Sequence, residues 1–155
     1  MKTISIYCLT LLLASTGYSQ EKSKIPNPAK VTKDQMSGNI FKNKDSHASV
    51  YNETTPVIDF VSLTSSDEKF ITGVYSSEAL HESYPDGYGM DEFWVLLSGS
   101  ITLTSEDGTV TVYNPGDACS ISSEWKGRWD TEGYTKVYSV YSRNGKWPSG
   151  GKLEK

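Results

Sequence analysis

The chain has 155 residues, carries a formal net charge of −4 at pH 7, and is 36% hydrophobic. A chain of this length can bury the core of one domain. Because the balance is acidic and no basic run occurs, nucleic-acid binding has no electrostatic support.

The first 19 residues have the order of a secretory signal peptide. Lys2 supplies a positive start, residues 4–14 form an apolar run, and the small residues Gly17 and Ser19 precede the expected cut. The run is shorter than the roughly 20 residues that span a bilayer. We therefore predict a cleaved signal peptide over residues 1–19 and a secreted or periplasmic protein with no membrane span. A buried N-terminal helix is the alternative.

The two ends of the remaining chain differ in composition from its middle. Residues 20–55 are polar and rich in Lys, Asn and Ser, and we predict a flexible lead-in there, with a short ordered piece near residues 40–41. Residues 143–155 are rich in Gly and Lys and predict a loose C-terminal tail.

Residues 56–142 contain short runs rich in Val, Ile, Thr, Tyr and Trp, separated by turn signals. The expected strands are residues 57–64, 69–77, 92–99, 100–104, 109–113, 118–122, 126–131 and 134–142. No long amphipathic helical pattern interrupts them. The pattern predicts one all-β domain, either a sandwich or a barrel.

The stretch from Met90 to Ser100, "MDEFWVLLSGS", places a carboxylate at the start of an apolar strand. Because side chains alternate along a strand, Glu92, Trp94 and Leu96 share one face. The other face carries Phe93, Val95 and Leu97. Both faces are largely apolar, which predicts a strand covered on both sides. If the first face points into a barrel, Glu92 lies in its cavity beside an indole ring.

A series of short motifs continues this pattern on either side. They are Gly73-Val74-Tyr75, Tyr84-Pro85, Asp91-Glu92-Phe93, Leu97-Ser98-Gly99, Asp107-Gly108, Pro115-Gly116-Asp117 and Lys126-Gly127-Arg128-Trp129. In this order the sequence resembles the cupins, and more closely the small subgroup related to the cupin domain of (S)-ureidoglycine aminohydrolases. The resemblance implies a double-stranded β-helix, which is the cupin jelly-roll barrel, with the site in its mouth. It also implies a homodimer.

The general cupin metal site uses three histidines and one glutamate, and the resemblance maps those positions onto this chain. Glu92 stands at the glutamate position, but Ala79 and Gly127 stand where the first and last histidines would be. The second histidine could be His81, although it lies far from Glu92 in sequence. Since two ligands rarely hold a catalytic metal, we predict no complete metal site. A divalent ion, if bound, would use His81 and Glu92; the cofactor is otherwise unknown.

Glu92 and His81 each have two interpretations. Glu92 could ligate a metal, bind a substrate or act as an acid or base; alternatively, it pairs with Arg128 or Lys126 across the sheet. His81 could contact a ligand, or it could be a solvated loop residue.

Aromatic residues supply the rest of the candidate site. Tyr75, Trp94 and Trp129 lie on expected strands, where they form either core or the wall of an aromatic pocket. Residues 82–90 form an expected loop that is either a lid, gripping a ligand with Tyr84 and Tyr88, or an ordinary surface loop.

These features predict a secreted cupin-domain protein that binds a small sugar-like or ureido-like ligand in its barrel. The alternative is a cupin isomerase, lyase or amidohydrolase that uses Glu92 as acid/base or metal ligand. A third interpretation is a partner domain that exposes a sheet edge.

Overall fold

The computed structural model describes residues 27–145. Its elements are α1 (Lys33–Met36), η1 (Asn39–Lys42), β1 (His47–Tyr51), β2 (Thr55–Thr64), β3 (Phe70–Tyr84), β4 (Asp91–Gly99), β5 (Ile101–Ser105), β6 (Val110–Tyr113), β7 (Ala118–Ile121) and β8 (Gly127–Tyr141). The all-β prediction is confirmed. The predicted signal peptide and the end of the tail lie outside the described residues. No helix within residues 27–145 is long and apolar enough to cross a membrane.

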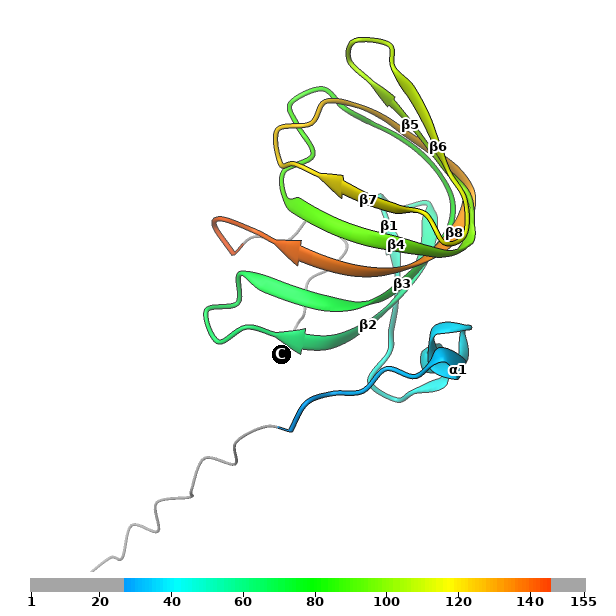
Figure 1. The fold of residues 1–155 in the computed structure, drawn as a ribbon, viewed down its shortest axis with the longest axis vertical. Coiled ribbons are helices and arrows are strands. Elements are labelled where there is room, and N and C mark those ends of the chain that lie inside the picture. The colour runs from blue at the N-terminus through cyan, green and yellow to red at the C-terminus, as the bar shows by residue number, and fades with distance from the viewer. Residues whose placement is uncertain (1–26, 146–155) are drawn as a thin grey trace, which may run out of the picture.

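The strands form one strongly curved antiparallel sheet in the order β1-β2-β3-β8-β4-β7, with β5 added to β8 and β6 to β5. Figure 1 shows the sheet bending around a concave face, with the β5–β6 hairpin opposite β2 and β3. This curvature agrees with the predicted jelly-roll barrel. The concave face therefore collects the side chains of strands that are distant in sequence.

β8 is one long strand, although the sequence predicted two shorter ones over residues 126–131 and 134–142. Gly133 lies where the break between the two strands was expected and has φ +132°. Its amide donates a hydrogen bond of 3.0 Å to the Thr131 hydroxyl. Pairing with β3 continues on both sides of this point. Because β8 also pairs with β4 and β5, its inward side chains line both ends of the barrel.

Residues 20–26 of the predicted flexible lead-in lie outside the described part of the chain, and over residues 27–55 the structure differs from that prediction. Thr32 and Gln35 form a capping box that begins α1, and the expected ordered piece near residues 40–41 corresponds to η1, where Ile40 is buried. β1 then pairs antiparallel with β2. The polar composition of this segment did not predict β1. The strand depends on pairing with β2, which no local pattern in the segment itself reveals.

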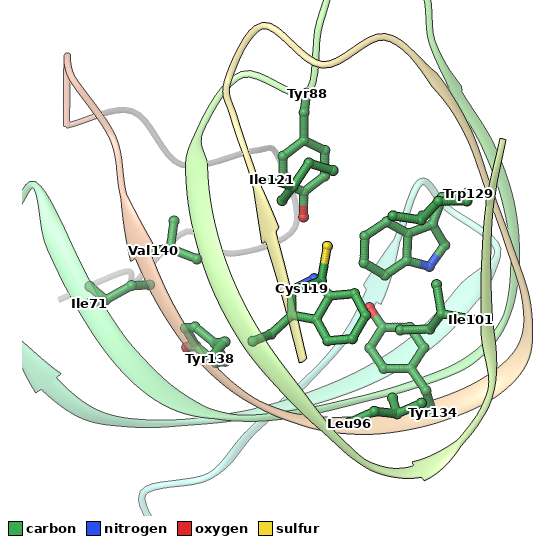
Figure 2. Packing of buried hydrophobic residues seen from close by; sticks show 12 residues of the cluster. Ile71, Tyr88, Leu96, Ile101, Cys119, Ile121, Trp129, Tyr134, Tyr138 and Val140 are labelled. Carbon is green, nitrogen blue, oxygen red and sulfur yellow. The ribbon is translucent and has the colours of Figure 1, made fainter. Parts of the chain in front are cut away.

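β4 shows how the core is arranged. Glu92, Trp94 and Leu96 are buried on the concave face, as the alternation indicated for one face. The prediction that both faces are covered holds only in part, because on the convex face Phe93 is 48% exposed while Val95 and Leu97 are half-buried. Figure 2 shows the buried cluster on the concave face, where aromatic rings from the loop after β3, from β4 and from β8 meet aliphatic side chains of β5 and β7.

Candidate functional site

Glu92 and Lys136 form a buried ion pair on the concave face. The ammonium nitrogen of Lys136 lies 2.7 Å from Glu92 Oε1, and the two side chains are 7% and 2% exposed. In the β4–β8 register, Leu96 is opposite Lys136 and Glu92 is opposite Val140, so both charged side chains point to the same face. The predicted alternatives Arg128 and Lys126 are not the partners of Glu92.

Tyr88 completes the contacts of this carboxylate. Its hydroxyl donates a hydrogen bond of 2.6 Å to Glu92 Oε2. The loop before β4 is held in place by its backbone: the Tyr88 amide donates to the Trp125 carbonyl and the Gly89 amide to the Ser123 carbonyl, both at 2.9 Å. Burial, together with the negative charge of Glu92, raises the Tyr88 pKa well above its usual value. Tyr88 therefore stays protonated at neutral pH and donates a hydrogen bond to Glu92.

Four aromatic rings surround the Lys136 ammonium. It lies 5.1 Å from the ring centroid of Trp129, 5.7 Å from Tyr134, 5.8 Å from Tyr75 and 6.0 Å from Trp94. Each ring face attracts a cation. The rings also contact one another: Trp129 stacks on Tyr88 at 6.1 Å and lies 5.9 Å from Trp94. The predicted residues Tyr75, Trp94 and Trp129 thus gather around a lysine that sequence reasoning missed.

The indole nitrogens of Trp94 and Trp129 are buried and have no hydrogen-bond partner. Such groups are rare in folded proteins, because an unpaired buried donor loses its hydrogen bonds to water without replacement. Trp125 is different: its indole nitrogen donates to Ser105 Oγ at 3.0 Å.

A second carboxylate lies on the same face. Asp59 of β2 accepts the Tyr138 hydroxyl at 2.9 and 3.1 Å on its two oxygens. Burial raises the pKa of Asp59 to about 6, while the bond from Tyr138 and the charge of Lys136 act in the opposite direction. The sequence signal was an aspartate within the alternating apolar run of β2, but only the pairing of β2 with β3 and β8 places it near Lys136.

Gly73 makes the contact between Asp59 and Tyr138 sterically feasible. It lies on β3, between β2 and β8. A Cβ atom at this position would overlap the Phe60 carbonyl oxygen and lie 2.8 Å from the Tyr138 hydroxyl. The first glycine of the motif series therefore leaves space for a side chain of another strand.

His81 lies away from this site. Its side chain is 51% exposed, and Nδ1 is 2.9 Å from Asp130 Oδ1 while Nε2 is 3.7 Å from Glu132 Oε1. It is on β3, opposite Asp130, rather than in a loop. Because its contacts are with the half-buried Asp130 and the exposed Glu132, the structure does not bring His81 together with Glu92.

Tyr84 lies at the end of β3 near the loop that carries Tyr88. The two rings are 5.2 Å apart in an edge arrangement, and the Tyr84 hydroxyl donates to Glu82 Oε2 at 3.3 Å. Tyr84 therefore contacts the aromatic cluster through Tyr88 and is not one of the four rings around Lys136. Residues 82–84 belong to the strand, so the loop before β4 is shorter than predicted.

The donor set at Glu92 does not fit a divalent metal ion. Within residues 27–145, no group of three or more His, Cys, Asp or Glu side chains is close enough to hold one. Both Glu92 oxygens already accept from Lys136 and Tyr88. An ammonium group occupies the position next to the carboxylate that a cation would need, and its positive charge would repel a second cation.

Comparisons with known proteins agree with the architecture. The model of the EutQ-like cupin domain family matches residues 82–138, which run from the end of β3 into β8. A protein of unknown function from Pseudomonas syringae pv. tomato is 19% identical with a TM-score of 0.52, and the alignment covers 59% of this chain and 39% of that one. No curated protein matches the sequence significantly.

Two further solved structures have lower TM-scores. The EutQ protein of Clostridium difficile is 14% identical with a TM-score of 0.49, over 62% of this chain and 74% of that one. A cupin superfamily protein from Desulfitobacterium hafniense is 15% identical with a TM-score of 0.43, over 56% and 77%. The family match and the barrel support the cupin jelly roll. The closer resemblance to ureidoglycine aminohydrolases stays a prediction.

Proposed function

We propose that this cupin-like barrel binds a small polar ligand at the Glu92–Lys136 pair, and that this binding needs no metal ion. The observation that carries the proposal is the buried ion pair beside two indole N–H groups without acceptors. A ligand that pairs with these groups would recover hydrogen bonds that the protein alone leaves unmade.

The surroundings of the pair suit sugar-like or ureido-like compounds. The rings of Tyr75, Trp94, Trp129 and Tyr134 supply flat apolar faces, while Lys136 supplies a fixed charge. Pockets for small molecules commonly combine such aromatic walls with a few polar groups that set orientation. Fold likeness does not choose among ligands, so this part of the proposal depends on the side chains alone.

Thermal shift against a panel of sugars, uronates and ureido compounds tests the proposal, because a ligand that binds the native state raises the melting temperature. We expect at least one compound to raise it in the wild type. The Glu92→Gln variant should lose most of that rise, whereas the exposed Glu124→Gln variant should keep it. A panel in which no compound changes the melting temperature would contradict the proposal.

An enzymatic role is the second candidate, and Asp59 is the observation that favours it. Its pKa of about 6 is close to neutral pH, where a carboxyl group can both give and take a proton. Asp59 and Glu92 would then be the acid and base of an isomerase, lyase or amidohydrolase reaction. Turnover of a bound compound, followed by loss of turnover in Asp59→Asn with binding retained, would favour this candidate.

Secretion and self-association are proposed from the sequence. Mass spectrometry of protein from its native host should find a chain that begins at Gln20 if residues 1–19 are a cleaved signal peptide. Light scattering should give twice the chain mass if the protein is a homodimer, and the mass of one chain would contradict that proposal.

A further inference from the structure

Around Lys136, hydrogen-bond donors outnumber hydrogen-bond acceptors. This excess of donors indicates which class of ligand the site would bind. An ammonium group has three N–H donors. In the described part of the chain, Glu92 Oε1 at 2.7 Å is the oxygen that accepts from it, and the other close neighbours are aromatic rings at 5.1 to 6.0 Å. A ring face attracts the charge but does not replace an oxygen acceptor. The ammonium therefore has more donors than partners.

Two indole groups add to this excess. Trp94 is fully buried, Trp129 is 2% exposed, and neither Nε1 has an acceptor. Both rings lie within 6.0 Å of Lys136 Nζ. The unpaired indole donors thus belong to two of the rings that pack around the Lys136 ammonium.

The acceptors on the same face already have donors. Lys136 and Tyr88 each donate to one oxygen of Glu92, and the Tyr138 hydroxyl lies within hydrogen-bond distance of both oxygens of Asp59. A ligand hydroxyl would bring a donor of its own and would have to compete for these oxygens. A carbonyl oxygen brings acceptor lone pairs alone, which is what the excess of donors requires.

The charge on this face disfavours an anion. The charges of Lys136 and Glu92 cancel, and Asp59 is negative whenever it is ionised. The π faces of Trp129 and Tyr134 that point toward Lys136 also repel negative charge. A carboxylate ligand would meet these repulsions, whereas an uncharged carbonyl compound would not.

The geometry points to a small uncharged ligand whose carbonyl oxygen accepts a hydrogen bond from the Lys136 ammonium beside the rings of Trp94 and Trp129. This inference rests on the proposed function, since it names the ligand class of the same site. In cupins that hold a metal, a cation stands beside the glutamate; here the ammonium of Lys136 provides the positive charge toward which the ligand oxygen turns.

Four-carbon probes that differ in one feature can test this inference by ¹⁵N–¹H NMR. The probes are γ-butyrolactone, its ring-opened anion 4-hydroxybutyrate, tetrahydrofuran, which keeps a ring but lacks the carbonyl, and the polyol erythritol. The reporters are the indole N–H signals of Trp94 and Trp129, assigned with Trp→Phe variants. Trp125 is the internal control, because its indole N–H already donates to Ser105.

We expect γ-butyrolactone to move the Trp94 and Trp129 indole signals, with an affinity about tenfold higher than that of the other three probes, while the Trp125 signal stays in place. The Lys136→Met variant leaves Glu92 buried without its partner and could unfold, so Lys136→Met with Glu92→Gln is the second variant. In that uncharged background the advantage of the lactone should disappear, whereas Lys126→Met should retain it.

Stronger binding of 4-hydroxybutyrate, tetrahydrofuran or erythritol would overturn the ligand class and leave the proposed function standing. Unchanged lactone binding in the Lys136→Met and Glu92→Gln double variant would overturn the role of the ammonium. If no probe moves a signal from the barrel and the wider panel also fails in thermal shift, the proposed function itself is wrong.

Discussion

The ammonium of Lys136 lies 2.7 Å from a carboxylate oxygen of Glu92, and the two residues come from neighbouring strands of the sheet. Their charges offset one another in a place where either charge alone would be costly. Along β4, Trp94 lies between Glu92 and Leu96, the residue opposite Lys136, and its ring is 6.0 Å from the ammonium. The pair therefore combines an electrostatic contact with aromatic packing.

Removal of one partner should destabilise the fold strongly. Glu92→Gln and Lys136→Met each leave a buried charge without its opposite, which costs about 3–5 kcal/mol for a pair of this kind. The double variant leaves no unpaired charge, so its free energy of unfolding should exceed that of either single variant. Urea denaturation of the four proteins gives the coupling energy. Additive losses would contradict the account of a directly coupled pair.

Asp59 should make stability depend on pH between about 4 and 6. Its pKa is raised from 3.8 to about 6 in the folded protein, so the folded state binds a proton more tightly than the unfolded state does. Stability from this group is therefore fully present below pH 3.8 and is lost as the pH rises to about 6. The change from 3.8 to about 6 corresponds to about 3 kcal/mol.

The comparison of wild type with Asp59→Asn isolates this effect. The wild type should gain stability relative to the variant as the pH falls from 7 to 4, because the variant has no proton to bind at this position. Denaturation midpoints at several pH values measure the difference. A difference that stays constant over this range would show that Asp59 has an ordinary pKa.

Gly73→Ala should separate Asp59 from Tyr138. The added Cβ overlaps the Phe60 carbonyl and approaches the Tyr138 hydroxyl to 2.8 Å, so β2 or Tyr138 must shift, at a cost of about 1–3 kcal/mol. Ser83→Ala, at an exposed position of the same strand, is the control and should change stability little. Equal stability of both variants would mean that the strands adjust freely.

Protein purified without chelator should contain divalent metal well below one ion per chain. The described residues offer no group of three ligands, and Glu92 is already paired with Lys136. Elemental analysis measures the content. Stoichiometric manganese, iron, nickel or zinc that disappears in Glu92→Gln would mean that the carboxylate holds a metal in solution.

The sequence was sufficient for the fold class and for the residues that share a strand face with Glu92, but it left open whether that face points into the barrel. Turn motifs at regular spacing predicted an all-β sandwich or barrel, and the resemblance to the cupins implied the barrel. Strand alternation put Glu92, Trp94 and Leu96 on one face. Alternation could not predict which apolar strand face meets solvent, because this depends on what packs against the sheet. Phe93 is exposed for that reason.

Strand pairing determines where the side chains of Lys136, Asp59 and His81 lie. No local pattern in the sequence reveals that pairing. Lys136 reaches Glu92 because β8 is adjacent to β4, and Asp59 reaches Tyr138 across Gly73 of β3. The sequence left two interpretations of His81 open, a ligand contact in the site with Glu92 or a solvated residue. The register of β3 with β8 instead sets it opposite Asp130.

Calorimetric titration of the best ligand from the thermal-shift panel tests the central claim most directly. The wild type should bind it without added metal, and the Glu92→Gln and Lys136→Met double variant should bind it at least about tenfold more weakly, since about 1.4 kcal/mol or more of interaction is removed. Equal affinity in the wild type and a folded double variant would contradict a site built on Glu92 and Lys136.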